Sequence, residues 1–324
     1  MSQKILVAGG GGFIGGHMVA RLKSEGHDVR SVDMKPTADW YQVHSDVENL
    51  QLDLAEKDAC EKAVAGVDKI YNLAADMGGM GFIENNKALC MLSVLINTHL
   101  LQAAEAAGVG RFFYASSACV YNGDKQTNPD VTALAEADAY PAMPEDGYGW
   151  EKLFSERMCR HYREDFGLET RVARYHNVYG PEGTWTGGRE KAPAAICRKI
   201  AEAKMSGNHT IDVWGDGLQT RSFMYVDDCL EGTIRLLESD IIEPINIGSS
   251  ELVTINQLTD MVAEIAGIEI ERNHDLTAPQ GVRGRNSDNT MILDLMGWEP
   301  SIPLRDGLET TYHWIVEQIN ASKA

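Results

Sequence analysis

Four side chains in the middle of the chain have the types and spacing for acid–base chemistry. Ser117 ends the strand-like run "RFFYASS" (111–117), and Cys119 follows two residues later. Tyr148 and Lys152 stand four residues apart, so on a helix they share one face. A thiol near cations can act as a base, since its reference pKa of about 8.5 then falls. Each also has an ordinary explanation: a satisfied strand-end serine, a packed cysteine and a solvated helix surface.

Alternating strand and helix patterns must position these residues. Continuous apolar runs, typical of strands buried on both faces of a parallel sheet, occur at 4–9, 28–33, 50–54, 69–75 and 111–117. Helical apolar spacing that ends near a glycine occurs at 14–26, 56–66 and 88–108, and a further helix is expected over 148–165. This alternation predicts an α/β fold with a doubly wound parallel sheet of the Rossmann type.

The second half of the chain is less regular and predicts a smaller mixed α/β lobe. Segments 220–229 and 243–249 are expected to return to the main sheet. We therefore expect a main domain from residues 1–178, rejoined by 218–248, and a smaller lobe from 179–217 and 249–324.

Glycines spaced for a dinucleotide follow the first expected strand. Gly9, Gly12 and Gly15 precede a helix, where a pyrophosphate needs a tight turn and a close backbone. Asp33, 18 residues past Gly15, would bond a ribose 2′-hydroxyl and repel a 2′-phosphate, which favours NAD over NADP. A simple flexible turn is the alternative. The expected NAD contacts are Gly9, Gly12, Phe13, Ile14, Gly15, Asp33, Asp53, Leu54, Ala74, Tyr148 and Lys152.

Composition limits the partners. The net charge of −19 over 324 residues disfavours nucleic acid and anionic membranes. The six cysteines form no CxxC pair, which argues against a zinc site and a disulfide framework. The chain enters a strand at once without a leader-like segment, and it has no run of about 18 apolar residues. We therefore expect a cytoplasmic protein with no metal and no membrane span.

The glycine spacing Gly-x-x-Gly-x-x-Gly resembles that of the extended short-chain dehydrogenase/reductase superfamily. Tyr148-x-x-x-Lys152, 31 residues beyond Ser117, strengthens the resemblance. It implies hydride transfer, with Tyr148 as the base toward a substrate hydroxyl that Ser117 positions. Lys152 would lower the tyrosine pKa near the nicotinamide and hold the ribose.

The position of Cys119 in this superfamily implies a further proton transfer. The matching position holds a glutamate base in sugar-nucleotide dehydratases and a cysteine base in GDP-fucose synthase. A transient ketone at C4 of a sugar would acidify the hydrogens at C3 and C5, because each anion is an enolate. An epimerase then needs one group to remove a proton and a second group to return it on the other face. A thiolate at Cys119 suits the first task.

Lys191, in "GGREKAPAA" (187–195), is the expected partner of Cys119. The apolar helix start that follows Lys191 would desolvate the ammonium and lower its pKa, which makes it a usable acid. On local grounds alone Lys191 is a typical solvated lysine, and the resemblance selects it.

Five longer strings are similar to the GDP-mannose 3,5-epimerase family, and the similarity runs over nearly the whole chain. They are "ADMGGMGFI" (75–83), "RFFYASSACVY" (111–121), "GTWTGGREKAPAA" (183–195), "WGDGLQTRSF" (214–223) and "GVRGRNSDN" (281–289). The resemblance implies that Cys119 and Lys191 are base and acid, and that Tyr148 and Lys152 are the redox pair. The implied contacts to a GDP-sugar are Gly78, Ser117, Cys119, Asn177, Glu190, Lys191, Ala192, Lys199, Gln219, Thr220, Arg221, Arg283 and Arg285.

Basic residues cluster in the expected smaller lobe of this acidic chain, as a pyrophosphate requires. They are Arg189, Lys191, Lys199, Arg221, Arg283 and Arg285. For Arg283 and Arg285 the sequence does not say which binds the diphosphate, and a solvated loop explains either alone.

Other functions stay open at this stage. A related sugar-nucleotide 4-epimerase, dehydratase or epimerase–reductase shares most of these motifs. An acid at position 119 is missing for a dehydratase, and Asp33 argues against the NADPH of a reductase. A silent nucleotide sensor on the same fold is a third reading. The ratio and order of C3 and C5 inversion, the substrate range and the pathway are not fixed by the sequence.

A homodimer is expected from family habit. The helices expected at 84–107 and 148–165 carry apolar faces suited to a four-helix seam, although such faces could equally cover the sheet.

Overall fold

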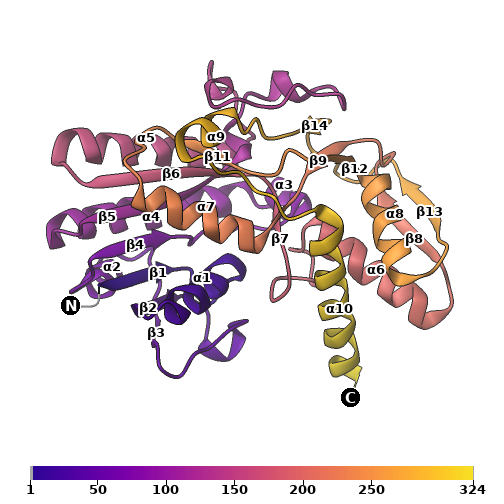
Figure 1. Ribbon diagram of the computed structural model, residues 1–324, viewed down its shortest axis with the longest axis horizontal. Coiled ribbons are helices and arrows are strands. Elements are labelled where there is room, and N and C mark those ends of the chain that lie inside the picture. The colour runs from indigo at the N-terminus through magenta and orange to yellow at the C-terminus, as the bar shows by residue number, and fades with distance from the viewer. Residues whose placement is uncertain (1–2, 324) are drawn as a thin grey trace.

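Seven parallel strands form the central sheet in the computed structural model, which describes residues 3–323 (Figure 1). Their order is β11-β6-β5-β4-β1-β2-β3. The strands are β1 (Lys4–Ala8), β2 (Asp28–Asp33), β3 (Glu48–Gln51), β4 (Lys69–Asn72), β5 (Arg111–Ser117), β6 (Glu169–Tyr175) and β11 (Ile245–Ile247). The order reverses direction at β1, so the doubly wound parallel sheet predicted from the apolar runs is confirmed.

Helices cover both faces of this sheet. One layer holds α1 and α7, which contact each other, and the other holds α2, α4 and α5, which pack in that sequence. The bounds are α1 (Phe13–Ser24), α2 (Lys57–Val64), α3 (Met80–Asn85), α4 (Lys87–Ala107), α5 (Tyr148–Phe166) and α7 (Val226–Glu238). Helices α4 and α5 end at Gly108 and Gly167 in left-handed conformations, the stop that the sequence pattern predicts.

A smaller lobe lies beside the sheet, at the right in Figure 1. Its helices α6, α8 and α10 pack on one another, and β8 pairs with β13. Its elements are α6 (Ala192–Ser206), β8 (Thr210–Trp214), β12 (Leu252–Thr254), α8 (Ile255–Ala266), β13 (Glu271–Asp275), β14 (Gly284–Arg285) and α10 (Leu304–Lys323). Helix α9 (Thr290–Met296) packs instead on β11 of the main sheet.

The expected return of segment 220–229 to the main sheet is wrong. This segment forms β9 (Thr220–Ser222), which pairs with β12 and β14, and β10 (Met224–Tyr225), which pairs with β7 (Val178–Tyr179). The guanidinium of Arg221 donates to the carbonyls of Gln280 and Val282, so this polar strand needs neighbours that a buried parallel sheet does not offer. Segment 243–249 does return, because β11 pairs with β6.

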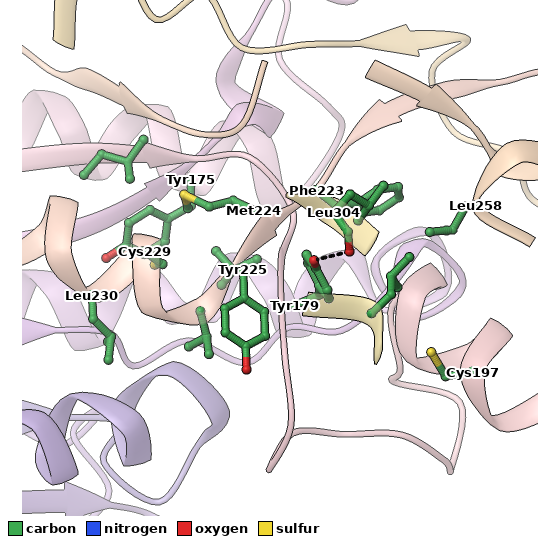
Figure 2. Packing of buried hydrophobic residues seen from close by; sticks show 14 of the residues in the cluster. Tyr175, Tyr179, Cys197, Phe223, Met224, Tyr225, Cys229, Leu230, Leu258 and Leu304 are labelled. Atoms are coloured by element: carbon green, nitrogen blue, oxygen red, sulfur yellow. Dashed lines mark hydrogen bonds between the residues drawn. The ribbon is translucent and has the colours of Figure 1, made fainter. Parts of the chain in front are cut away.

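One apolar core joins the sheet to the smaller lobe. Figure 2 shows Tyr175 and Cys229 beside the sheet, Phe223 and Tyr179 at the crossing, and Cys197 and Leu258 on the helices of the smaller lobe. The hydroxyl of Tyr179 donates to the carbonyl of Leu304 at 2.9 Å, which fixes the start of α10. The sheet and the smaller lobe are therefore packed against each other through a shared apolar core.

Helix α4 leaves an apolar face uncovered. By length and composition it is the one helix within residues 3–323 that could cross a membrane, with a mean hydropathy of 1.2 over 18 residues. It packs between α2 and α5, as a helix that covers a sheet does. Its outward side chains Leu89, Met91, Leu92 and Leu95, with Trp150 and Phe154 of α5, are exposed.

Candidate active site

A cavity of about 460 Å³ lies between the carboxyl ends of the central strands and the smaller lobe. Residues that follow β4, β5 and β6 line the cavity. Ligands of open α/β sheets bind at this edge. All the residues predicted to be catalytic line it: Ser117, Cys119, Tyr148, Lys152 and Lys191. Side chains from three strand ends and two helix starts therefore meet in one place.

Tyr148 and Lys152 project from the first two turns of α5. Lys152 is buried, and its ammonium donates to the carbonyl of Ala115 at 3.0 Å and lies 5.5 Å from the ring centre of Tyr148. Burial raises the pKa of the Tyr148 phenol well above its usual range, whereas the hydrogen bond from Ser117 lowers it. Burial therefore favours the phenol over the phenolate at Tyr148, even with the Lys152 ammonium beside the ring.

Cys119 sits in a single turn, Ala118–Val120, immediately after β5. The amide of Cys119 donates to the hydroxyl oxygen of Ser117 at 3.2 Å, so the catalytic serine also shapes this turn. Arg285 donates to the Cys119 sulfur at 3.5 Å. The sequence predicted that such a cation lowers the thiol pKa, but burial outweighs it, followed by Glu145, and raises that pKa to about 11. Without a bound substrate, burial thus favours the thiol over the expected thiolate.

Lys191 immediately precedes α6 and faces the cavity. The amide of Gly79 donates to the carbonyl of Arg189 at 2.9 Å. This hydrogen bond holds the loop before α6 against the segment that follows β4. Within residues 3–323 the Lys191 ammonium makes no hydrogen bond or ion pair. Burial lowers its pKa, as the sequence predicted, while the neighbouring Cys119 opposes that change. An amine with no fixed partner is free to exchange a proton in the cavity.

The loop before α1 fits a dinucleotide. A Cβ at Gly9 would lie 2.9 Å from the amide nitrogen of Ala74, and one at Gly15 would lie 2.0 Å from the carbonyl oxygen of Gly9. Gly9 also has φ +83°. The first turn of α1 holds no acidic side chain and Gly12 offers no capping side chain, so its amides are available to a pyrophosphate. These residues fit NAD as the sequence predicted.

The other expected cofactor residues lie around this loop. Asp33 ends β2, is buried and accepts from the amide of Lys35, and Asp53 accepts from the amide of Ala55. Leu54 is buried behind Asp53. Phe13 and Ile14 open α1, and Ile14 also lines the cavity.

Trp40 and Lys35 contact this loop but were not predicted from the sequence. A Cβ at Gly11 would lie 2.6 Å from the indole of Trp40, and the Lys35 ammonium donates to the carbonyl of Gly11 at 2.7 Å. Only their closeness to Asp33 in the chain was a signal.

Most of the expected substrate contacts share the cavity. Those that line it are Gly78, Asn177, Glu190, Ala192, Lys199, Gln219, Arg221 and Arg285, besides the catalytic residues. Thr220 and Arg283 do not: the Thr220 hydroxyl donates to the carbonyl of Pro129, and Arg283 is turned to Asp216. Gly79, next to Gly78, admits the loop before α6, since a Cβ there would lie 2.4 Å from the Glu190 carbonyl oxygen.

Of Arg221, Arg283 and Arg285, only Arg221 makes no ion pair within the described residues. Arg283 forms a two-pronged pair with Asp216, at 3.1 Å on each arm, and Arg285 pairs with Glu145 at 2.6 Å. Arg221 donates to backbone carbonyls alone, and burial lowers its pKa to about 10. An anion that enters the cavity can therefore pair with Arg221, whose positive charge no carboxylate neutralises within the described residues. Lys199 also lines the cavity.

The sequence analysis missed several residues of the lining and its support. They are Glu145 and Gln126 behind the cavity, and Ile83, Asp212, Trp214 and Gln280 on its wall. Within residues 3–323 no group of His, Cys, Asp or Glu is placed to hold a metal ion.

Comparison with known proteins places this geometry in a family. The model of the NAD dependent epimerase/dehydratase family matches residues 5–248. GDP-mannose 3,5-epimerase 1 of Oryza sativa subsp. japonica is 50% identical over 321 residues, covering 99% of this chain and 83% of that protein. This similarity confirms the resemblance seen in the motifs.

Solved structures agree in fold. The UDP-glucose 4-epimerase of Thermotoga maritima with UDP-glucose superposes with a TM-score of 0.87 at 25% identity, covering 98% of this chain and all of that one. The UDP-glucuronic acid 4-epimerase of Bacillus cereus, in complex with UDP-glucuronic acid and NAD, gives 0.83 at 26% identity over 98% and 100%. The chain belongs to the NAD dependent epimerase/dehydratase family, on the branch that holds the GDP-mannose 3,5-epimerases.

Proposed function

We propose that this protein is an NAD-dependent epimerase that inverts C3 and C5 of GDP-mannose to give GDP-L-galactose, with GDP-L-gulose as the product of inversion at C5 alone. The observation that carries the proposal is the meeting of two sets of groups in one cavity. Tyr148 and Lys152 serve oxidation and reduction, while Cys119 and Lys191 serve proton exchange. The half-identical relatives are GDP-mannose 3,5-epimerases, which supports the same substrate here.

Oxidation at C4 begins with the loss of a hydroxyl proton. Tyr148 takes that proton, Ser117 holds the same oxygen, and Lys152 keeps a positive charge beside the phenolate. The glycine loop would hold NAD, which would supply the hydride acceptor and donor for C4. Because the hydride is returned within one turnover, no external reductant is consumed.

Inversion needs two proton exchanges on opposite faces of the 4-ketosugar. Cys119, at the end of β5, and Lys191, at the start of α6, belong to the two parts of the protein that enclose the cavity. In each inversion one group breaks a C–H bond, leaving an enolate, and the other supplies a proton to the same carbon. Direct polar contact with Arg285 stabilises sulfur whenever it carries negative charge.

Product identification tests this proposal. Purified protein is incubated with GDP-mannose and no added cofactor, and products are identified by NMR. GDP-L-galactose, with or without GDP-L-gulose, supports the proposal. Conversion of a UDP-sugar at C4 with no reaction of GDP-mannose would instead make the protein a 4-epimerase, and loss of water would make it a dehydratase.

Arg221→Gln should weaken binding of GDP-mannose more than it slows the chemistry. Within the described residues the Arg221 guanidinium donates to backbone carbonyls and has no carboxylate partner. Its loss therefore removes a positive charge that would pair with the diphosphate. We expect KM to rise about tenfold to a hundredfold, with kcat within about threefold. Arg283→Gln is the matched control, because Asp216 already neutralises that arginine. Equal effects of both variants would refute this assignment.

We also propose a homodimer through the exposed apolar face of α4 and α5. Leu92 is 56% exposed and lies beside the other outward apolar side chains of these helices. Leu92→Glu should convert a dimer into a monomer in light scattering, because it places a charge in that seam. Leu276→Glu, at a site 66% exposed on the smaller lobe, should leave the dimer intact. A wild-type monomer, or a dimeric Leu92→Glu variant, would contradict the proposal.

The location in the cytoplasm stays a prediction. The lack of nucleic-acid and membrane partners also stays a prediction, and the charge of −19 disfavours nucleic acid and anionic membranes.

A further inference from the structure

Arg285, expected from the sequence to contact the substrate, has its three nitrogens committed to protein groups. The side chain is 3% exposed. Its Nε donates to Gln126 Oε1 at 2.7 Å, its Nη1 to the sulfur of Cys119 at 3.5 Å, and its Nη2 to Glu145 Oε1 at 2.6 Å. The guanidinium is therefore a partner of the thiol, held in place by Gln126 and Glu145.

Glu145 is fixed to the turn that carries Cys119. Its backbone amide donates to the carbonyl of Cys119 at 3.0 Å. The same carbonyl is approached so closely by α5 that a Cβ at Gly149 would lie 2.3 Å from it. The loop before α5 and the turn after β5 are thus locked together, which sets the carboxylate beside the sulfur.

The carboxylate of Glu145 is held next to the thiol through Arg285, which contacts both groups. Its second oxygen, Oε2, is buried and has no hydrogen-bond partner within residues 3–323. Besides burial, the negative charge of Glu145 raises the pKa of Cys119, while Arg285 lowers it. Sulfur therefore accepts from Arg285 in the presence of a carboxylate that disfavours its ionisation.

Burial is the largest cause of the raised pKa of Cys119, and Glu145 is the charged group that adds to it. Arg285 lies on β14, Arg221 on β9 and Lys191 at the start of α6, and all three are cationic groups that interact with Cys119. The uncharged groups that face it are Ser117 of β5, Tyr148 of α5 and Cys90 of α4. Glu145 is the carboxylate in contact, and it opposes these cations.

We propose that Glu145 is a positioning residue for Cys119: it aims Arg285 at the sulfur and keeps the proton on the sulfur in the resting enzyme. The inference rests on the proposed function for its role in turnover. In the half-reaction where sulfur acts as acid, the S–H bond breaks, a C–H bond forms and the thiolate left behind is held by the N–H of Arg285. The carboxylate disfavours that thiolate, so the thiol is restored when a proton becomes available.

Alkylation of Cys119 tests the inference without any sugar. The holoenzyme and its Glu145→Gln variant are treated with iodoacetamide from about pH 7 to about pH 10, and the peptide that carries Cys119 is followed by mass spectrometry. Iodoacetamide reacts with thiolate. We expect the glutamine variant to react about tenfold or more faster at about pH 8, its profile shifted down by about one pH unit or more. Asp146→Asn, the same charge change at an exposed neighbour paired with Lys87, should leave the profile unchanged.

Two further variants keep the test decisive. Arg285→Gln should shift the profile in the opposite direction, and if Glu145→Gln does not fold, Glu145→Asp, whose shorter carboxylate is withdrawn from the sulfur, should give a smaller downward shift. An unchanged profile in the folded glutamate variants overturns the inference even where GDP-mannose is epimerised normally. A shifted profile in a protein that does not turn over GDP-mannose upholds the coupling and refutes only the proposed function.

Discussion

Replacing Cys119 with alanine is expected to abolish inversion at C3 and C5 and to leave NAD bound. The thiol is 7% exposed at the cavity wall, and no other sulfur lines that cavity within the described residues except those of Met77 and Met80, which carry no proton. Losing one of two proton-exchange groups should lower kcat about 10³-fold, within the range of general acid–base catalysis. Product formation from GDP-mannose measures the loss, and the nicotinamide content of the purified variant shows that the cofactor site is intact.

Cys90→Ala is the matched control for that variant. Cys90 is a buried thiol in the same small apolar cluster as Cys119, but it does not line the cavity. It should epimerise within about threefold of the wild type. Normal inversion by Cys119→Ala would show that another group moves the proton, and the assignment of Cys119 would then fail.

Tyr148→Phe should stop the reaction at an earlier step. Without the phenol oxygen the C4 hydroxyl loses the base assigned to it, so C4 is not oxidised and neither C3 nor C5 becomes acidic. We expect kcat to fall about 10³- to 10⁴-fold. The variant should also lose the exchange of sugar hydrogens with solvent.

The two variants are distinguished by the state of the nicotinamide. Cys119→Ala can still oxidise the sugar, so mixing it with GDP-mannose should produce the absorbance of reduced nicotinamide. Tyr148→Phe should produce none. Tyr162→Phe, a tyrosine on the same helix that packs on Phe166 away from the cavity, serves as the control. Solvent exchange by Tyr148→Phe at the wild-type rate would remove Tyr148 from the mechanism.

The sheet was predictable because its strands are apolar on both faces. Strand β5 matched its expected range 111–117, whereas β3 begins at Glu48 and ends at Gln51 rather than at 54. That strand lies at the edge of the sheet and is only partly buried, so its apolar pattern is weak. Segment 220–229 misled for the opposite reason, since its apolar residues pack between the lobes instead of in the sheet.

The site was predictable where its residues lie within local motifs. Tyr148 and Lys152 share one helix, and Ser117 and Cys119 share one turn, so spacing alone brings each pair together. Glu145 lies only three residues before Tyr148, yet its partner Arg285 is 140 residues away in the chain. No spacing rule connects them, and the sequence could not tell that Arg285 serves the thiol while Arg221 is left for an anion.

The position of solvent hydrogen in the product is the sharpest test of the proposed mechanism. GDP-mannose is incubated with the wild-type protein in deuterated water, and the sugar is analysed by NMR. We predict deuterium at C5 and C3 of the inverted sugar and the original hydrogen at C4, where hydride leaves and returns. Deuterium at C4, or inversion without any solvent label at C3 and C5, would contradict it.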